Sequence, residues 1–135
     1  MRKYKILIIE NDEDEQLFMR EAFENGGFEI LAQLESGNQL MEWLNAHQDN
    51  LPDLILSDLN MPGRNGYDIT SDIKSDKHFS YIPVIITSTS SAKSIMDKCY
   101  EQGASLYMVK PDTFIEYSEF VKRLRNELEQ RQLLR

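Results

Sequence analysis

Short apolar runs alternate with amphipathic helical patterns five times along this chain of 135 residues. Parallel strands need a crossover between them, and a helix is the usual crossover. This alternation is therefore typical of a parallel sheet with helices on both faces. The apolar runs, which we expect to form strands, are Lys5 to Ile9, Phe28 to Leu34, Leu54 to Asp58, Val84 to Ser88 and Ser105 to Val109. The sequence predicts one doubly wound α/β domain with five parallel strands.

The character of each run indicates where its strand lies in the sheet. The first, third and fourth runs are continuous in isoleucine, leucine and valine, as expected for strands buried on both faces. The second run mixes polar and apolar residues and is better suited to an edge. The predicted helices cover Asp14 to Asn25, Asn38 to His47, Tyr67 to Ser75, Ala92 to Gln102, and a last segment that starts near Ile115. Glycines directly after the first and fourth helices support their ends.

No linker or repeat divides the chain, so we expect a single domain over residues 1–135, with its core at about 4–130 and no output domain. The net charge of −8 argues against nucleic acid as a partner, because binding it needs a basic surface that displaces counterions. No apolar stretch approaches the roughly 18 residues of a membrane helix, so we expect no membrane span. Cys99 is the only cysteine and cannot form an internal disulfide, which favours a reducing cytoplasm.

Polar residues follow four of the predicted strands at the point where each strand ends. Glu10-Asn11-Asp12 follow the first strand, Asp58 and Ser88 close the third and fourth, and Lys110 follows the fifth. The carboxyl ends of parallel strands meet at one edge of an open α/β sheet, where such folds bind ligands. Taken alone, Asp58 is best explained as a solvated loop acid. Its coincidence with three other polar strand ends predicts a site instead.

These residue types suit a carboxylate that accepts a phosphoryl group. A carboxylate is a weak nucleophile, so transfer to Asp58 depends on positioning and on neutralising charge. Mg²⁺ provides that neutralisation and prefers oxygen ligands. The Lys110 ammonium can hold one phosphoryl oxygen, and the Ser88 hydroxyl can donate to another. The expected ligands of the metal are Glu10, Asn11, Asp58 and the carbonyl of Asn60.

Four stretches together resemble the receiver domain of two-component response regulators. They are the acidic cluster after the first strand, SDLNMPGRNG around Asp58, IPVIITSTS at the fourth strand and GASLYMVKP around the fifth. The resemblance extends from about Tyr4 to Gln130 and implies a flavodoxin-like fold with strand order 2-1-3-4-5. It also implies that Asp58 accepts a phosphoryl group from a phosphohistidine, with Mg²⁺. The donor would be a sensor histidine kinase or a histidine phosphotransfer protein.

The resemblance assigns further roles by matched position. It makes Ser88 the hydroxyl switch and Lys110 the lysine that contacts the phosphoryl group. Asn60 and Ser90 occupy the two positions that influence dephosphorylation in receivers. The peptide bond between Lys110 and Pro111 is expected to be cis, as in the family.

One position departs from the pattern of the family. Receivers usually carry two adjacent acids after the first strand, and the second acid is a direct metal ligand; here the pair is Glu10-Asn11. An amide oxygen can still coordinate Mg²⁺ but adds no charge, so we expect functional but weaker metal binding. Another interpretation of Glu10-Asn11-Asp12 is that they cap the first helix, and the two roles are compatible.

Signal output is expected through the face formed by the fourth helix, the fifth strand and the last helix. Phosphorylation of Asp58 would draw Ser88 and Lys110 towards it, and Tyr107, the family's aromatic switch, would then turn inward. The alternative for Tyr107 is a half-buried strand aromatic without such a role. The switched face would act on a downstream protein or on a second copy, and the long last helix is compatible with a homodimer.

We weigh three functions. The leading one is a stand-alone phospho-acceptor switch, similar to the small regulators paired with phytochrome-type kinases, with no enzymatic activity beyond phosphorylating itself and slowly losing the phosphate. The second is a receiver-like module that binds its partner without phosphorylation, which Asn11 favours and the intact Asp58, Ser88 and Lys110 oppose. The third is a phosphatase with an aspartyl intermediate. Asn60 disfavours it, because such enzymes use a second aspartate at that position for proton transfer.

Overall fold

The computed structural model describes residues 2–113 and 115–134. Its centre is a parallel sheet made of β1 (Tyr4–Ile9), β2 (Phe28–Leu34), β3 (Leu54–Asp58), β4 (Val84–Ser88) and β5 (Leu106–Val109). The strands lie in the order β2-β1-β3-β4-β5, which confirms the expected flavodoxin-like order and the edge position of the second strand. β1, β3 and β4 lie inside the sheet, where both faces of each strand are buried and continuous apolar sequence is required.

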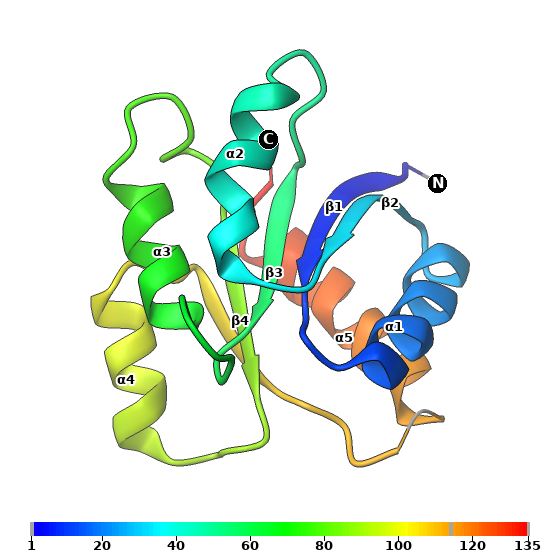
Figure 1. Ribbon diagram of the computed structural model, residues 1–135. Coiled ribbons are helices and arrows are strands. Elements are labelled where there is room, and N and C mark those ends of the chain that lie inside the picture. Colours follow the sequence, from blue (N-terminus) through cyan, green and yellow to red (C-terminus); the bar gives the residue numbers. More distant parts are fainter. Residues whose placement is uncertain (1, 114, 135) are drawn as a thin grey trace.

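Helices cover both faces of this sheet (Figure 1). One face carries α1 (Glu13–Asn25) and α5 (Glu116–Gln130), and the other carries α2 (Leu40–Ala46), α3 (Gly66–Lys74) and α4 (Lys93–Glu101). The predicted helices agree with these bounds to within one residue, except for the second. There the chain first forms a 3-10 turn over Gly37–Gln39, which the Ser36 side chain caps, and only then enters α2. None of the described helices is long and apolar enough to cross a membrane.

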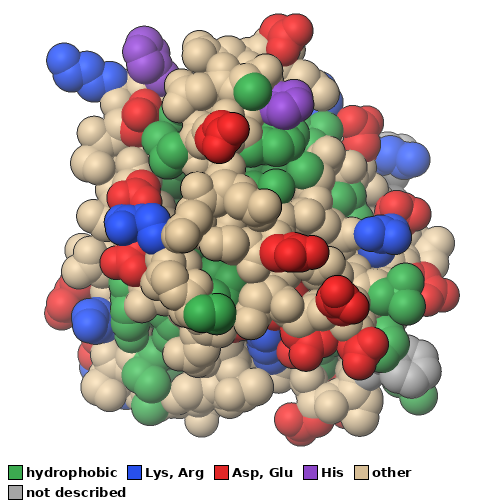
Figure 2. Space-filling model, in the orientation of Figure 1, with side chains coloured by type: hydrophobic (Ala, Val, Ile, Leu, Met, Phe, Trp, Pro, Cys, Tyr) green, Lys and Arg blue, Asp and Glu red, His purple; other side chains and the backbone are tan. Residues whose placement is uncertain are grey.

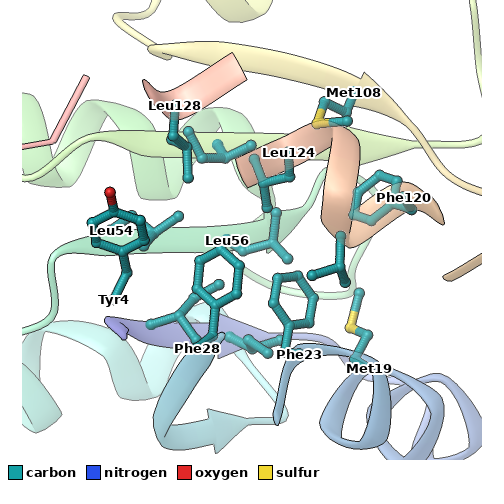
Figure 3. Packing of buried hydrophobic residues seen from close by; sticks show 14 of the residues in the cluster. Tyr4, Met19, Phe23, Phe28, Leu54, Leu56, Met108, Phe120, Leu124 and Leu128 are labelled. Atoms are coloured by element: carbon teal, nitrogen blue, oxygen red, sulfur yellow. The ribbon is translucent and has the colours of Figure 1, made fainter. Parts of the chain in front are cut away.

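The alternation of side chains along each strand divides the core into two clusters, one on each face of the sheet. Figure 3 shows the cluster under α1 and α5. All five strands contribute to it, and β4 does so through Ile85. In this cluster Phe23 and Phe28 meet edge to face, with ring centroids 5.1 Å apart. The second cluster lies under α2, α3 and α4 and buries Cys99. Because both faces are packed, the ends of the strands are held in fixed positions.

The loop after β3 turns tightly into α3 with the help of two glycines. Gly63 has a φ of +77°, a left-handed conformation that residues with a Cβ rarely adopt. Gly66, the first residue of α3, packs so closely that an added Cβ would lie 2.9 Å from Leu59 Cα and 3.1 Å from Asp58 O. A capping box that begins at Asn65 fixes the start of the helix. The backbone that carries Asp58 is therefore held in place by α3.

Candidate functional site

Four strand ends meet at one edge of the sheet. Glu10 follows β1, Asp58 ends β3, Ser88 ends β4 and Lys110 follows β5, and Figure 1 shows these ends on the same side of the molecule. The register of the sheet sets Asp58 opposite Thr87, the residue before Ser88. The side chains of all four residues at the strand ends are buried. The structure thus brings together the groups that the sequence predicted to converge.

Lys110 lies at the centre of a cluster of ion pairs. Its Nζ is 2.8 Å from Glu10 Oε1, 2.9 Å from Glu15 Oε2 and 3.3 Å from Asp58 Oδ1. The Lys110 side chain is only 6% exposed, so water screens these interactions weakly. One ammonium among three carboxylates leaves a formal charge of −2 when all four groups are ionised. The cluster therefore attracts a further cation.

The pKa values of the cluster show the same imbalance. Burial raises the pKa of Glu10 to about 7, against the opposing effect of its hydrogen bond from Lys110. Burial also raises the pKa of Asp58, and Lys110 again opposes the shift. Burial lowers the pKa of Lys110, but its hydrogen bonds to Glu10 and Glu15 outweigh this effect and raise the pKa overall. Lys110 therefore stays an ammonium, and it does not fully offset the cost of burying the carboxylates of Glu10 and Asp58.

The oxygen donors at this edge match the preference of Mg²⁺ for hard ligands. Glu10 and Asp58 supply carboxylates, and Asn11 is exposed directly beyond β1. Within residues 2–113 and 115–134, no three His, Cys, Asp or Glu side chains form a ready-made metal site. A bound cation would therefore depend on the amide oxygen of Asn11 and the carbonyl of Asn60 in addition to the two carboxylates. The residues fit Mg²⁺ but offer it less charge than two adjacent acids would.

Ser88 joins the loops that follow β3 and β4. Its Oγ accepts hydrogen bonds from the Ser90 N–H at 3.2 Å and from Asn60 Nδ2 at 3.4 Å. Both bonds use the lone pairs of the hydroxyl, so its hydrogen is free to be donated to an incoming oxygen. The structure thus sets Asn60 and Ser90, the two predicted tuning positions, against the same hydroxyl.

Tyr107 is buried and points inward. Its hydroxyl donates a hydrogen bond of 2.6 Å to the carbonyl of Ser90, and its ring belongs to the cluster under α2, α3 and α4. The ring is thus more deeply buried than the alternative of a half-buried strand aromatic describes, and its role as a switch stays a prediction. Through Ser90, the phenol is connected to the loop that begins at Ser88.

Glu15 and Tyr117 belong to this site, although the sequence did not indicate them. The Tyr117 hydroxyl donates to Glu15 Oε2 at 2.8 Å, and the same oxygen contacts Lys110. Asp12 caps α1 by accepting a hydrogen bond of 2.9 Å from the Glu15 N–H, which confirms the capping interpretation of this acid. The sequence feature that could have identified Glu15 is the cap at Asp12, because a helix that starts after Asp12 has Glu15 in its first turn. Figure 2 shows acidic side chains gathered around the start of α1.

The prediction of a cis peptide bond between Lys110 and Pro111 is wrong. The described backbone contains no cis bond, so Lys110 and Pro111 are joined in trans. The two isomers of a bond before proline differ by only about 0.5–1 kcal/mol, so proline permits the cis form without imposing it. The Lys110 N–H donates to the Ser88 carbonyl at 2.8 Å, which keeps the chain extended up to the proline.

Known proteins of matching sequence are signalling proteins. A family model described as response regulator receiver domain matches residues 6–125. The probable methanogenesis regulatory protein FilR2 of Methanothrix harundinacea is 27% identical over 124 residues, which cover 89% of this chain and 80% of that protein. Chemotaxis protein CheY1 of Helicobacter pylori is 28% identical over 109 residues, which cover 81% of this chain and 86% of CheY1. The two-component response regulator ARR3 of Arabidopsis thaliana is 33% identical over 103 residues, which cover 70% of this chain but 43% of ARR3.

Solved structures agree with this relationship. The phosphorylated cyanobacterial phytochrome response regulator RcpA superposes with a TM-score of 0.82 at 27% identity, covering 93% of each chain. The Mn²⁺-bound response regulator Rcp1 superposes with a TM-score of 0.77 over 91% of this chain and 92% of its own; at 23% identity it supports the fold alone. Family match, strand order and superposition therefore lead to one conclusion: this chain belongs to the response regulator receiver domains, the signalling modules of two-component systems.

Proposed function

We propose that this receiver is a switch that is activated when Asp58 accepts a phosphoryl group. The observation that carries the proposal is the buried contact of 3.3 Å between Lys110 Nζ and Asp58 Oδ1, at the edge where the Ser88 hydroxyl also lies. An ammonium in this position stabilises the negative charge of the phosphoryl oxygens during transfer. The donor would be the phosphohistidine of a sensor histidine kinase or of a histidine phosphotransfer protein.

In the proposed transfer, a carboxylate oxygen of Asp58 attacks phosphorus in line with the P–N bond of the phosphohistidine. The new O–P bond forms as the P–N bond breaks, and the imidazole leaves with the bonding electron pair and takes up one proton from solvent. Lys110 and Ser88 each hold a phosphoryl oxygen during this exchange. Bound Mg²⁺ would neutralise part of the charge on these oxygens. The residues that would hold the ion are Glu10, Asn11, Asp58 and, through its carbonyl, Asn60.

The switch would run from Ser88 to the face formed by α4, β5 and α5. A Ser88 hydroxyl that donates to a phosphoryl oxygen shifts towards it and strains its bonds from Ser90 and Asn60. Tyr107 is bonded to the Ser90 carbonyl, so a displacement of this loop reaches the aromatic ring. Asn60 and Ser90 border the acceptor, and we assign to them the tuning of the slow hydrolysis that returns the resting state.

The proposed output surface is a groove of about 520 Å³ between α4, β5 and α5. Its lining combines apolar side chains such as Met96 and Tyr100 with cations such as Arg123. Val109 and Tyr100 are each 39% exposed there, which is high for large apolar side chains. Tyr107 lines the same groove, so a change in its rotamer would change the shape that a downstream protein or a second copy meets.

A binding module that works without phosphorylation is the second candidate. The observation that favours it is Asn11, which adds no charge to the carboxylates of Glu10 and Asp58 at a metal site. In that case the groove would recognise its partner constitutively, and the buried cluster around Lys110 would serve stability only.

The test is the intact mass of the protein after incubation with acetyl phosphate and Mg²⁺. We expect one added phosphoryl group, which is lost in Asp58→Asn and in the presence of EDTA. If the folded wild-type protein gains no mass from acetyl phosphate or from a phosphohistidine donor, the switch is refuted and the constitutive module is favoured.

A further inference from the structure

Glu15 makes two interactions that the proposed phosphoryl transfer does not require. Its Oε2 lies 2.9 Å from Lys110 Nζ and accepts a hydrogen bond of 2.8 Å from the Tyr117 hydroxyl. The Glu15 side chain is 30% exposed, whereas Lys110 and Tyr117 are buried. One carboxylate therefore joins the first turn of α1, the end of β5 and the first turn of α5.

This third carboxylate opposes the binding of a phosphoryl group. It adds negative charge where a group of about −1.5 to −2 charges must bind. It also competes for hydrogen bonds, because an ammonium has three N–H donors and Glu10, Glu15 and Asp58 already surround it. A phosphoryl oxygen can gain a bond from Lys110 only by displacing one of these carboxylates.

Solvent exposure decides which carboxylate yields. The Glu10 side chain is 1% exposed, so water cannot replace the hydrogen bond that it would lose. Asp58 is the acceptor itself. Glu15 is partly exposed, and it keeps the Tyr117 hydroxyl as a partner when Lys110 turns away.

We propose that Glu15 is a positioning residue that restrains Lys110 until a phosphoryl group displaces it, and that this release is transmitted through Tyr117 to α5. The proposal rests on the function of Asp58 as acceptor. The Tyr117 ring packs against Phe120 with centroids 5.8 Å apart, inside the cluster that joins α1 and α5. A change at Glu15 therefore alters the contact between these two helices. This outlet is separate from the one through Tyr107 and α4.

The test compares Glu15→Gln with Glu13→Gln as a matched control. Both substitutions remove one negative charge from the first turn of α1, but Glu13 is exposed and only Glu15 contacts Lys110. The probe is trifluoroberyllate with Mg²⁺, which binds a carboxylate oxygen as a phosphoryl mimic. We expect Glu15→Gln to bind it about threefold to tenfold more tightly than Glu13→Gln does, because a competing charged hydrogen bond has been removed. Equal affinities of the two variants would overturn the restraint.

NMR signals of the Tyr117 and Phe120 rings provide a readout that a purely structural role would not change. We expect both ring signals to shift when the mimic binds to the wild-type protein. In Glu15→Gln both signals should keep their positions when the mimic binds. In Tyr117→Phe the signal of the Phe120 ring should keep its position. Ring signals that shift equally in all variants would overturn the path to α5. A wild-type protein that binds no mimic and accepts no phosphoryl group would overturn the proposed function as well. If the wild type binds trifluoroberyllate, and Glu15→Gln and Glu13→Gln bind it with the same affinity and the same ring shifts, only the role of Glu15 is overturned.

Discussion

Replacing Gly66 with alanine tests whether α3 sets the position of the acceptor loop. The added methyl group would lie 2.9 Å from Leu59 Cα, 3.1 Å from Asp58 O and 3.1 Å from Ile86 Cδ1. Two of these neighbours are backbone atoms, so the contact can be relieved only if the loop or the helix moves. The φ of Gly66 lies outside the left-handed region, so the substitution adds a steric contact without backbone strain.

Overpacking of this kind costs about 1–3 kcal/mol. Alanine is favoured over glycine by about 1 kcal/mol inside a helix, and the first helical position gains only part of that. We therefore expect Gly66→Ala to lower the free energy of unfolding by about 1–2 kcal/mol. For a domain of this size the loss corresponds to a decrease in Tm of about 3–8 °C.

The free energy of unfolding and the Tm of the wild type and of Gly66→Ala can be measured by urea and thermal unfolding. Ser71→Ala is the control, because Ser71 is exposed in the same helix. Phosphorylation by acetyl phosphate should also be slower in Gly66→Ala, since the backbone of Asp58 must shift, and unchanged in Ser71→Ala. A Gly66→Ala protein as stable as the Ser71→Ala protein would refute the close packing of α3 against the acceptor loop.

Three further predictions concern the metal, the core and the cysteine. Asn11→Asp should tighten Mg²⁺ binding by about fivefold to tenfold, because it adds a charged ligand; unchanged or weaker affinity in a titration would contradict the assignment of Asn11. Phe23→Ala should lower the free energy of unfolding by about 3–5 kcal/mol, since the ring is fully buried; urea unfolding with a loss below about 1 kcal/mol would disagree with this packing. Burial raises the pKa of the Cys99 thiol, so native protein should react with iodoacetamide much more slowly than unfolded protein at about pH 8.5. Stability from this thiol is complete below the unfolded pKa and is lost as the pH rises towards the folded pKa; equal alkylation rates in the two states would exclude a buried thiol.

Much of the fold could be predicted from the sequence, because its strongest signals are local. β1, β3 and β4 each contain an uninterrupted stretch of isoleucine, leucine or valine, and such a stretch is typical of a strand that lies inside a sheet with helices on both faces. The order of the strands came from the family resemblance, since apolar runs alone do not say which strands are neighbours. The convergence of Glu10, Asp58, Ser88 and Lys110 followed from topology, because every parallel strand ends at the same edge.

The features that could not be predicted depend on tertiary contacts. Glu15 and Tyr117 are 102 positions apart, and their hydrogen bond exists only because α1 packs against α5. Either residue alone looks like an ordinary helical position. The isomer of the peptide bond before Pro111 could not be predicted from the sequence either. The free energies of its cis and trans forms differ by less than a single tertiary contact contributes.

The position of β5 at the end of the sheet has a consequence for the kinetics of the switch. β5 has four residues and hydrogen-bonds to β4, whereas β3, which carries Asp58, has a partner strand on each side. The strand that carries Tyr107 can therefore open locally without disturbing the strand that carries the acceptor. Amide hydrogen exchange should be faster in β5 than in β3. The phosphoryl transfer would then take place on an inner strand that opens rarely, while the signal would leave through an edge strand that opens more easily.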